Sequence, residues 1–316
     1  MLRTRVWLVT LFLLGAAGIA PKDDPPPPWA FVVAQPLPHS PFQGDVTVPG
    51  SALHVDAKVL DDPAREPDWF AQDHGKMPEI VSRGRVPKLT PCDACHLPTG
   101  IGGPDSAALT GLAAPYIEEQ FAEFRSGRRG CPIKTGAQCS NDMHEEALAA
   151  TADEVATASA YFASLKFVSR TRVVETATVP KTKVEYYSLV RAGTGQEPIG
   201  ERIIEVPDDA KLFWLGDWRS PVIAYVPPGS IARGRALVAN GDRAAPCAAC
   251  HGAQLQGTSI APPLAGRSPT YIVRQLYNIK YGFRSGAAVA QMLPEVARMT
   301  AQDRIFIAAY LAALRG

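Results

Sequence analysis

Two short stretches of the sequence place cysteine and histidine at the same spacing. One lies at residues 91–96 and reads PCDACH, and the other lies at residues 246–251 and reads PCAACH. The two residues between the cysteines match the spacing of the two haem vinyl groups, so each sulfur can form a thioether bond. The adjacent histidine can then bind the iron. The pattern assigns covalent attachment to Cys92, Cys95, Cys247 and Cys250, and iron binding to His96 and His251.

A structural zinc site and a pair of disulfides are the alternative interpretations of these cysteines. A Cys-x-x-Cys zinc site needs further cysteine or histidine ligands, and none follows at zinc-ribbon spacing in this sequence. The recurrence of the whole hexapeptide in one chain favours two covalently bound c-type haems over both alternatives.

The two motifs belong to an internal repeat. They lie 155 residues apart, and the same offset relates Tyr116 to Tyr271 and Gln120 to Gln275. Further along the chain the offset is 149, which aligns residues 160–165 (AYFASL) with residues 309–314 (AYLAAL). The first copy therefore carries six extra residues, and they fall in the stretch RRGCPIKTGAQCSND at residues 128–142.

Each copy of the repeat has the apolar periodicity of amphipathic helices. The expected helices lie within residues 115–127 and 151–165 of the first copy, and 230–241, 270–282 and 300–314 of the second. Thr151 and Thr300 are expected N-caps, since acidic or amide residues follow each of them. The segment 168–228 is instead rich in β-branched and aromatic residues with turn signals between them, which predicts a small β-rich connector.

The N-terminal residues read as an export signal. Arg3 and Arg5 precede a nine-residue apolar run at residues 6–14, and small residues follow. The apolar stretch 6–20 is shorter than the ~20 residues that span a bilayer, so we favour cleavage after Ala17, with an uncleaved anchor as the alternative. Residues 21–50 then hold nine prolines, which predicts an extended arm whose Trp29 and Phe31 pack onto the protein.

With these motifs and this repeat, the chain resembles the class I c-type cytochromes, and in particular their bacterial dihaem members. The resemblance implies a mainly α fold, with two tandem class I cytochrome c domains joined by the β-rich connector and preceded by the Pro-rich arm. The implied boundaries are a signal peptide or anchor at 1–20, the arm at 21–66, domain 1 at 67–167, the connector at 168–228 and domain 2 at 229–316.

The resemblance also implies a methionine as the sixth iron ligand, on a loop before the last helix of each domain. Met292 stands there in the second copy, and the repeat aligns it with Met143 in the first. His144 directly follows Met143 and is the competing ligand. We expect Met299 to be a core residue, Met77 to pack, and His39, His54 and His74 to be surface or structural residues.

In the same family a proline carbonyl accepts the other ring N–H of the axial histidine, which sets the ring orientation. Pro262 matches that proline in the second copy, whereas Ala107 stands at the equivalent position of the first. We expect the hydrogen bond to survive there, because the acceptor is a backbone carbonyl.

Cys131 and Cys139 lie in the inserted loop and are expected to form a disulfide, with a thiolate ligand or redox-active thiol as the alternative.

The charge composition of the chain argues against one class of function, nucleic-acid binding. With 32 basic and 31 acidic residues, the chain has no charge excess that would suggest nucleic-acid binding.

From the haem motifs and the resemblance, we expect a periplasmic electron-transfer protein, not an enzyme, that relays single electrons between an exported dehydrogenase or quinol-oxidising complex and a terminal oxidase. It would contact a membrane only if the N-terminal segment stayed uncleaved. The alternatives are a dihaem redox enzyme, peroxidase-like or thiosulfate-oxidising, and a cytochrome subunit of a dehydrogenase.

Overall fold

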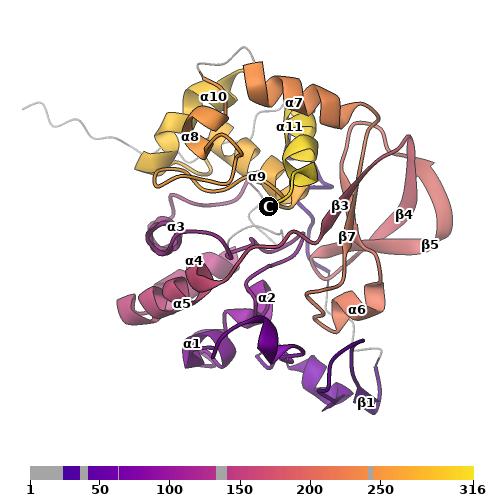
Figure 1. Cartoon of the computed structure of the whole chain (residues 1–316), viewed down its shortest axis with the longest axis vertical. Coiled ribbons are helices and arrows are strands. Elements are labelled where there is room, and N and C mark those ends of the chain that lie inside the picture. The colour runs from indigo at the N-terminus through magenta and orange to yellow at the C-terminus, as the bar shows by residue number, and fades with distance from the viewer. Residues whose placement is uncertain (1–23, 36–41, 63, 133–140, 241–244) are drawn as a thin grey trace, which may run out of the picture.

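A computed structural model describes residues 24–35, 42–62, 64–132, 141–240 and 245–316 of the chain. The expected signal segment 1–20, His39 and Cys139 lie outside the described residues. Figure 1 shows the helices of the second copy grouped above those of the first, with the strands of the connector beside them. None of the helices in these ranges has both the length and the apolar character needed to span a bilayer.

The first copy is built from helices. They are α1 (Glu79–Ser82), α2 (Asp93–His96), α3 (Ala114–Arg125), α4 (Asn141–Ala149) and α5 (Ala152–Ser164). Helix α5 begins at the predicted N-cap Thr151, which forms a capping box with Glu154. Ile117 of α3 and Phe162 of α5 are almost completely buried in the core of this copy.

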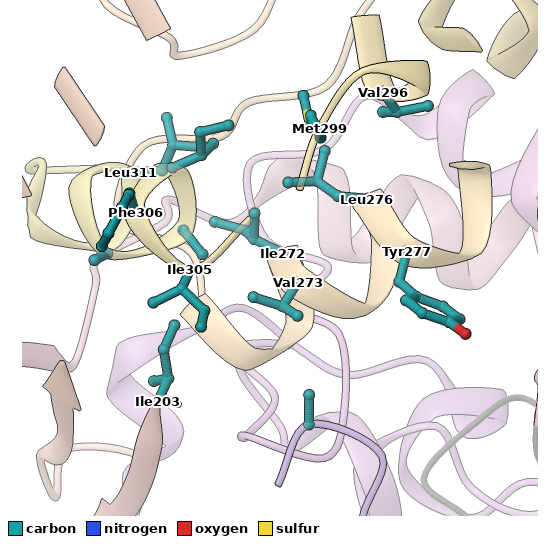
Figure 2. Close-up of a cluster of buried hydrophobic side chains, with 14 of the residues drawn as sticks. Ile203, Ile272, Val273, Leu276, Tyr277, Val296, Met299, Ile305, Phe306 and Leu311 are labelled. Atoms are coloured by element: carbon teal, nitrogen blue, oxygen red, sulfur yellow. The ribbon is translucent and has the colours of Figure 1, made fainter. Parts of the chain in front are cut away.

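The second copy repeats this arrangement with more buried residues. Its elements are α7 (Ser230–Asn240), α8 (Ala248–His251), α9 (Pro269–Lys280), η3 (Ala287–Met292), α10 (Leu293–Ala297) and α11 (Ala301–Ala313). The predicted cap Thr300 forms a capping box with Asp303. Figure 2 shows the core, in which apolar side chains of α9 and α11 meet, among them Ile272, Val273 and Ile305.

The connector forms two small sheets, in agreement with its β-branched composition. Strands β3 (Thr171–Glu175), β7 (Val222–Val226) and β6 (Ile204–Pro207) form one sheet, in which β3 and β7 run parallel and β6 runs antiparallel to β7. Strands β4 (Thr178–Glu185) and β5 (Ser188–Pro198) form an antiparallel hairpin. The short helix α6 (Ala210–Trp214) lies between β6 and β7 in sequence.

The N-terminal segment packs against the protein, as the aromatic residues within it predicted. Phe31 is 1% exposed and its ring meets Tyr277 of α9 edge-on, while Trp29 is partly buried on the same core. The rest of the expected arm is not simply extended, since it contains β1 (Asp45–Val46), β2 (Val55–Asp56) and η1 (Ala57–Asp61), and η2 (Ala71–Asp73) follows. A local apolar cluster around Val48 and Trp69 makes these turns possible.

Candidate haem sites

The first motif lies on the short helix α2. Cys92 is the N-cap of this helix and His96 is its last residue. The His96 ring is buried, and its Nδ1–H donates a 2.8 Å hydrogen bond to the Ala107 carbonyl. The ring is therefore held by the loop that follows the motif, and Nε2 remains the nitrogen that can bind a metal ion.

The second motif has the same arrangement on α8. Cys247 is the N-cap, His251 ends the helix, and its Nδ1–H donates to the Pro262 carbonyl at 2.7 Å. The two carbonyl acceptors expected from the sequence are therefore confirmed. In both copies the histidine carbonyl also accepts a loop N–H, from Gly102 at 3.0 Å and from Gly257 at 2.9 Å.

The donor set in both copies fits a covalently attached haem. None of the four motif cysteines forms a disulfide, so each sulfur is available for a thioether bond to a vinyl group. Burial raises the pKa of Cys92 to about 12, which keeps this thiol protonated at neutral pH. Burial lowers the pKa of His96 and of His251, so both imidazoles are neutral, which is the form that binds iron.

Met143 lies on α4, next to the first motif. Glu146 of the same helix accepts a 3.0 Å hydrogen bond from the Thr90 N–H, two residues before Cys92. The competing ligand His144 is half-buried, and its Nδ1–H donates to the Phe124 carbonyl of α3 at 2.7 Å. The structure thus brings α4 to the motif and ties the His144 ring to the neighbouring helix.

Met292 is the last residue of η3 and is half-buried against the core of the second copy. Cys247 and Ala248 of the second motif pack against that same core. Met299 is 3% exposed within it, which confirms the expectation that Met299 is a core residue. Met77 is likewise partly buried, on the core of the first copy.

The remaining cysteines and histidines take structural positions where they are described. Cys131 is disulfide-bonded, whereas its expected partner Cys139 lies outside the described residues. His74 has a side chain only 2% exposed and bonds Asp68 at 2.9 Å, and His54 pairs with Asp45 at the surface. These contacts agree with the surface or structural roles expected for both histidines.

Two arginines, one half-buried and one buried, join the two copies and were not predicted from the sequence. Arg129 of the first copy donates to the Tyr271 hydroxyl of the second, and Arg284 donates to the Tyr116 hydroxyl of the first. Backbone hydrogen bonds accompany them, and Arg129 and Arg284 form an isolated antiparallel bridge. The signal was present in the sequence, because all these residues recur at the 155-residue offset although helix amphipathicity does not require them.

The connector also reaches the first site, which the sequence did not predict. The Tyr187 hydroxyl donates to Asp142 of α4 at 3.2 Å from the tip of the β4–β5 hairpin. Tyr186 at the same tip has φ of 50°, a strained value for a bulky residue. Its carbonyl accepts a 3.0 Å hydrogen bond from the Gln35 N–H of the N-terminal segment. No corresponding hairpin occurs among the described residues 229–240 and 245–316 of the second copy, so the two sites differ in their surroundings.

Comparison with known proteins relates the sequence to cytochromes and the fold to a thiosulfate dehydrogenase. The Cytochrome c family matches residues 231–315. The chain is 37% identical to cytochrome c-554(548) of Halomonas halodenitrificans over 70 residues, which is 22% of this chain and 84% of that protein. It is 25% identical to the thiosulfate dehydrogenase electron acceptor of Thiomonas intermedia over 230 residues, which is 72% of this chain and 80% of the relative.

Among solved structures, the thiosulfate dehydrogenase TsdBA of Marichromatium purpuratum matches with a TM-score of 0.50 and 26% identity. The match covers 75% of this chain but only 39% of the solved chain. The expectation that the protein is not an enzyme is corrected by this finding, because the chain resembles part of a dehydrogenase. The expected haem electron-transfer role agrees with the similarity to a cytochrome and to an electron acceptor. Cysteine motifs and methionine loops report haem binding, and they do not separate a carrier from a part of an enzyme.

Proposed function

This chain belongs to the c-type cytochromes, and from that premise we propose that it carries electrons through two haems within a thiosulfate dehydrogenase system. The similarity to a thiosulfate dehydrogenase electron acceptor, over 80% of that protein, supports the choice of donor. The observation that carries the two-haem proposal is the repeated site geometry, in which His96 and His251 donate to matching loop carbonyls.

The proposed sites use the residues predicted from the sequence. Thioether bonds would form at the four motif cysteines, and His96 and His251 would bind the irons through Nε2. Met143 and Met292 are the proposed sixth ligands. The repeat, which aligns Met143 with Met292, supports Met143 over His144. The proposed haem-binding domains span residues 67–167 and 229–316, in an exported chain.

When bound, each haem supplies one-electron exchange between Fe(III) and Fe(II). The chain supplies the orientation and basicity of the histidine ligands through the Ala107 and Pro262 carbonyls. Burial keeps both imidazoles neutral. Coupling of two thiosulfate ions to tetrathionate releases two electrons, so two haems can accept the whole yield of one turnover.

The test begins with purified full-length protein in the ferric state. Thiosulfate is added alone, then together with a purified thiosulfate dehydrogenase, and haem reduction is followed by absorbance; a soluble quinol is the control donor. We expect the haems to be reduced only when thiosulfate is present, either alone or together with the dehydrogenase. Reduction by thiosulfate alone would assign the oxidation itself to this chain. Reduction by quinol only would contradict the thiosulfate proposal and favour a quinol-oxidising donor.

A further inference from the structure

The two loops that orient the axial histidines differ in their intrinsic stiffness. Pro262 and Pro263 stand in the second copy where Ala107 and Ala108 stand in the first, at the 155-residue offset. A proline ring restricts its own φ and the conformation of the residue before it. The loop of the second copy is therefore stiffened at the histidine acceptor itself, whereas the first-copy loop, residues 102–110, has alanines at these two positions.

The first-copy loop is held by an arginine from the other copy. The Arg267 guanidinium donates to the Ala108 carbonyl at 2.9 Å and to the Thr110 carbonyl at 2.7 Å. Ala108 directly follows Ala107, whose carbonyl accepts the His96 ring N–H at 2.8 Å. Arg267 is 5% exposed, and its guanidinium carbon lies 3.9 Å from the centre of the Phe167 ring. Both hydrogen bonds are thus shielded from competing water.

Two further arginines hold the earlier part of the same loop. Arg274 of α9 donates to the Pro104 carbonyl at 2.7 Å, and Arg170 of the connector donates to the Gly102 carbonyl. Charged donors make stronger hydrogen bonds than neutral ones. The backbone carbonyls of the His96 loop therefore accept hydrogen bonds from arginines outside the first copy along most of the loop.

The support runs in one direction. The 155-residue offset places Leu112 at the first-copy position that corresponds to Arg267. A leucine cannot donate a hydrogen bond, so the first copy does not return this contact to the Pro262 loop. The loop without the two prolines is thus held by an arginine from the other copy. The loop with the two prolines has no equivalent arginine at the matching position of the first copy.

We propose that Arg267 is a positioning residue for the haem site of the first copy, in place of the two prolines that stiffen the second. The inference rests on the proposed function, since it requires haem at both motifs. A loosened loop would lengthen the His96–Ala107 hydrogen bond and make the imidazole less basic. The ferric state would then be less stabilised, and the reduction potential of the first haem would rise.

The first test is the variant Arg267→Lys in the full chain. Lysine keeps the positive charge but cannot hold two carbonyls with one planar group, so the effect of charge is separated from that of positioning. Paramagnetic proton NMR of the ferric protein resolves the methyl groups of each haem. Contacts with Phe162, whose ring lies 6.5 Å from that of His96, assign the first haem. We expect shifted signals and a raised potential for the first haem only.

The second test restores the prolines. Ala107→Pro and Ala108→Pro remove no hydrogen bond of the described residues, because neither N–H donates one there. In the Arg267→Lys background they should return the first-haem signals and potential to wild-type values. If the single variant does not accumulate as folded protein, the triple variant is compared directly with wild type, and first-haem signals that differ from wild type overturn the proposal.

The remaining outcomes separate this inference from the function on which it rests. Haem content is first measured by mass spectrometry of the wild-type chain. A chain with one haem overturns both the two-haem proposal and this inference. Two haems with unchanged first-haem signals in Arg267→Lys overturn the inference alone. Equal changes at both haems also overturn it, because they indicate general loosening of the protein and no specific support of the His96 loop.

Discussion

Arg284 of the second copy donates a 2.9 Å hydrogen bond to the Tyr116 hydroxyl of the first copy. The 155-residue offset maps this pair onto Arg129 and Tyr271, which are joined by a 3.0 Å hydrogen bond in the opposite direction. Each copy thus lends one arginine to the other, as at an interface with two-fold pseudosymmetry. Neither Arg129 nor Arg284 has a carboxylate partner among the described residues, so the tyrosine hydroxyls are important acceptors.

Removal of either hydroxyl should destabilise the folded chain. Tyr116→Phe or Tyr271→Phe leaves a buried guanidinium short of one acceptor, which we expect to lower the free energy of unfolding by about 1–3 kcal/mol. Urea unfolding followed by circular dichroism measures the change. Tyr310→Phe is the matched control, since the Tyr310 hydroxyl has no hydrogen bond within the described part of the chain. Equal stability of all three variants would contradict the prediction.

Glu66 should make the stability of the protein depend on pH. Burial, with a smaller contribution from the nearby Asp93, raises the pKa of Glu66 to about 8. Because the unfolded chain releases this proton near the ordinary glutamate pKa, unfolding releases a proton between about pH 4.5 and pH 8. The contribution of protonated Glu66 to the free energy of unfolding is fully present below pH 4.5 and is lost as the pH rises to about 8.

The variant Glu66→Gln removes the titrating carboxyl group and tests the direction of this pH dependence. We expect its free energy of unfolding to exceed that of the wild type at pH 8.5 and to be close to it at pH 4.5, as measured by urea titration at both values. Glu145→Gln, a change at an exposed residue of α4, is the control. A wild-type pH profile in Glu66→Gln would refute the assignment.

The proposed methionine ligands have a spectroscopic signature. Methionine bound to Fe(III) haem gives a weak charge-transfer band at the red end of the spectrum, and Met143→Ala and Met292→Ala should each abolish about half of it. The reduction potential of the affected haem should fall, since Met/His ligation raises it. Met299→Leu is the control, because Met299 is buried in the core and the change nearly conserves volume. A full band in Met143→Ala would direct attention to His144.

The disulfide of Cys131 should stabilise the loop inserted before α4. If Cys139 is the partner, the closed loop is short, and the chain-entropy contribution is about 2–3 kcal/mol. We expect Cys131→Ser to lower the free energy of unfolding by up to that amount and to make it insensitive to reductant. Peptide mapping under non-reducing conditions identifies the partner. A wild-type response to reductant in Cys131→Ser would show that the stabilising bond lies elsewhere.

Local residue patterns were enough to predict the haem motifs, the repeat and most of the helices. The motif spacing, the capping threonines and the apolar periodicity act over a few residues, so they can be read without the fold. The carbonyl acceptors could also be predicted, because the resemblance to class I cytochromes c implies one at Pro262 and the repeat carries it to Ala107. The turns of the N-terminal segment could not, since distant apolar partners stabilise them.

The tertiary structure alone decided how the two copies depend on each other. The sequence shows that Ala107 and Ala108 replace two prolines, and from that substitution only a loosened loop could be inferred. The compensating donor is Arg267, whose hydrogen bonds span 159 and 157 residues of sequence. No local pattern specifies such a contact, because it exists only once the second copy packs against the first and the arginine is buried between them.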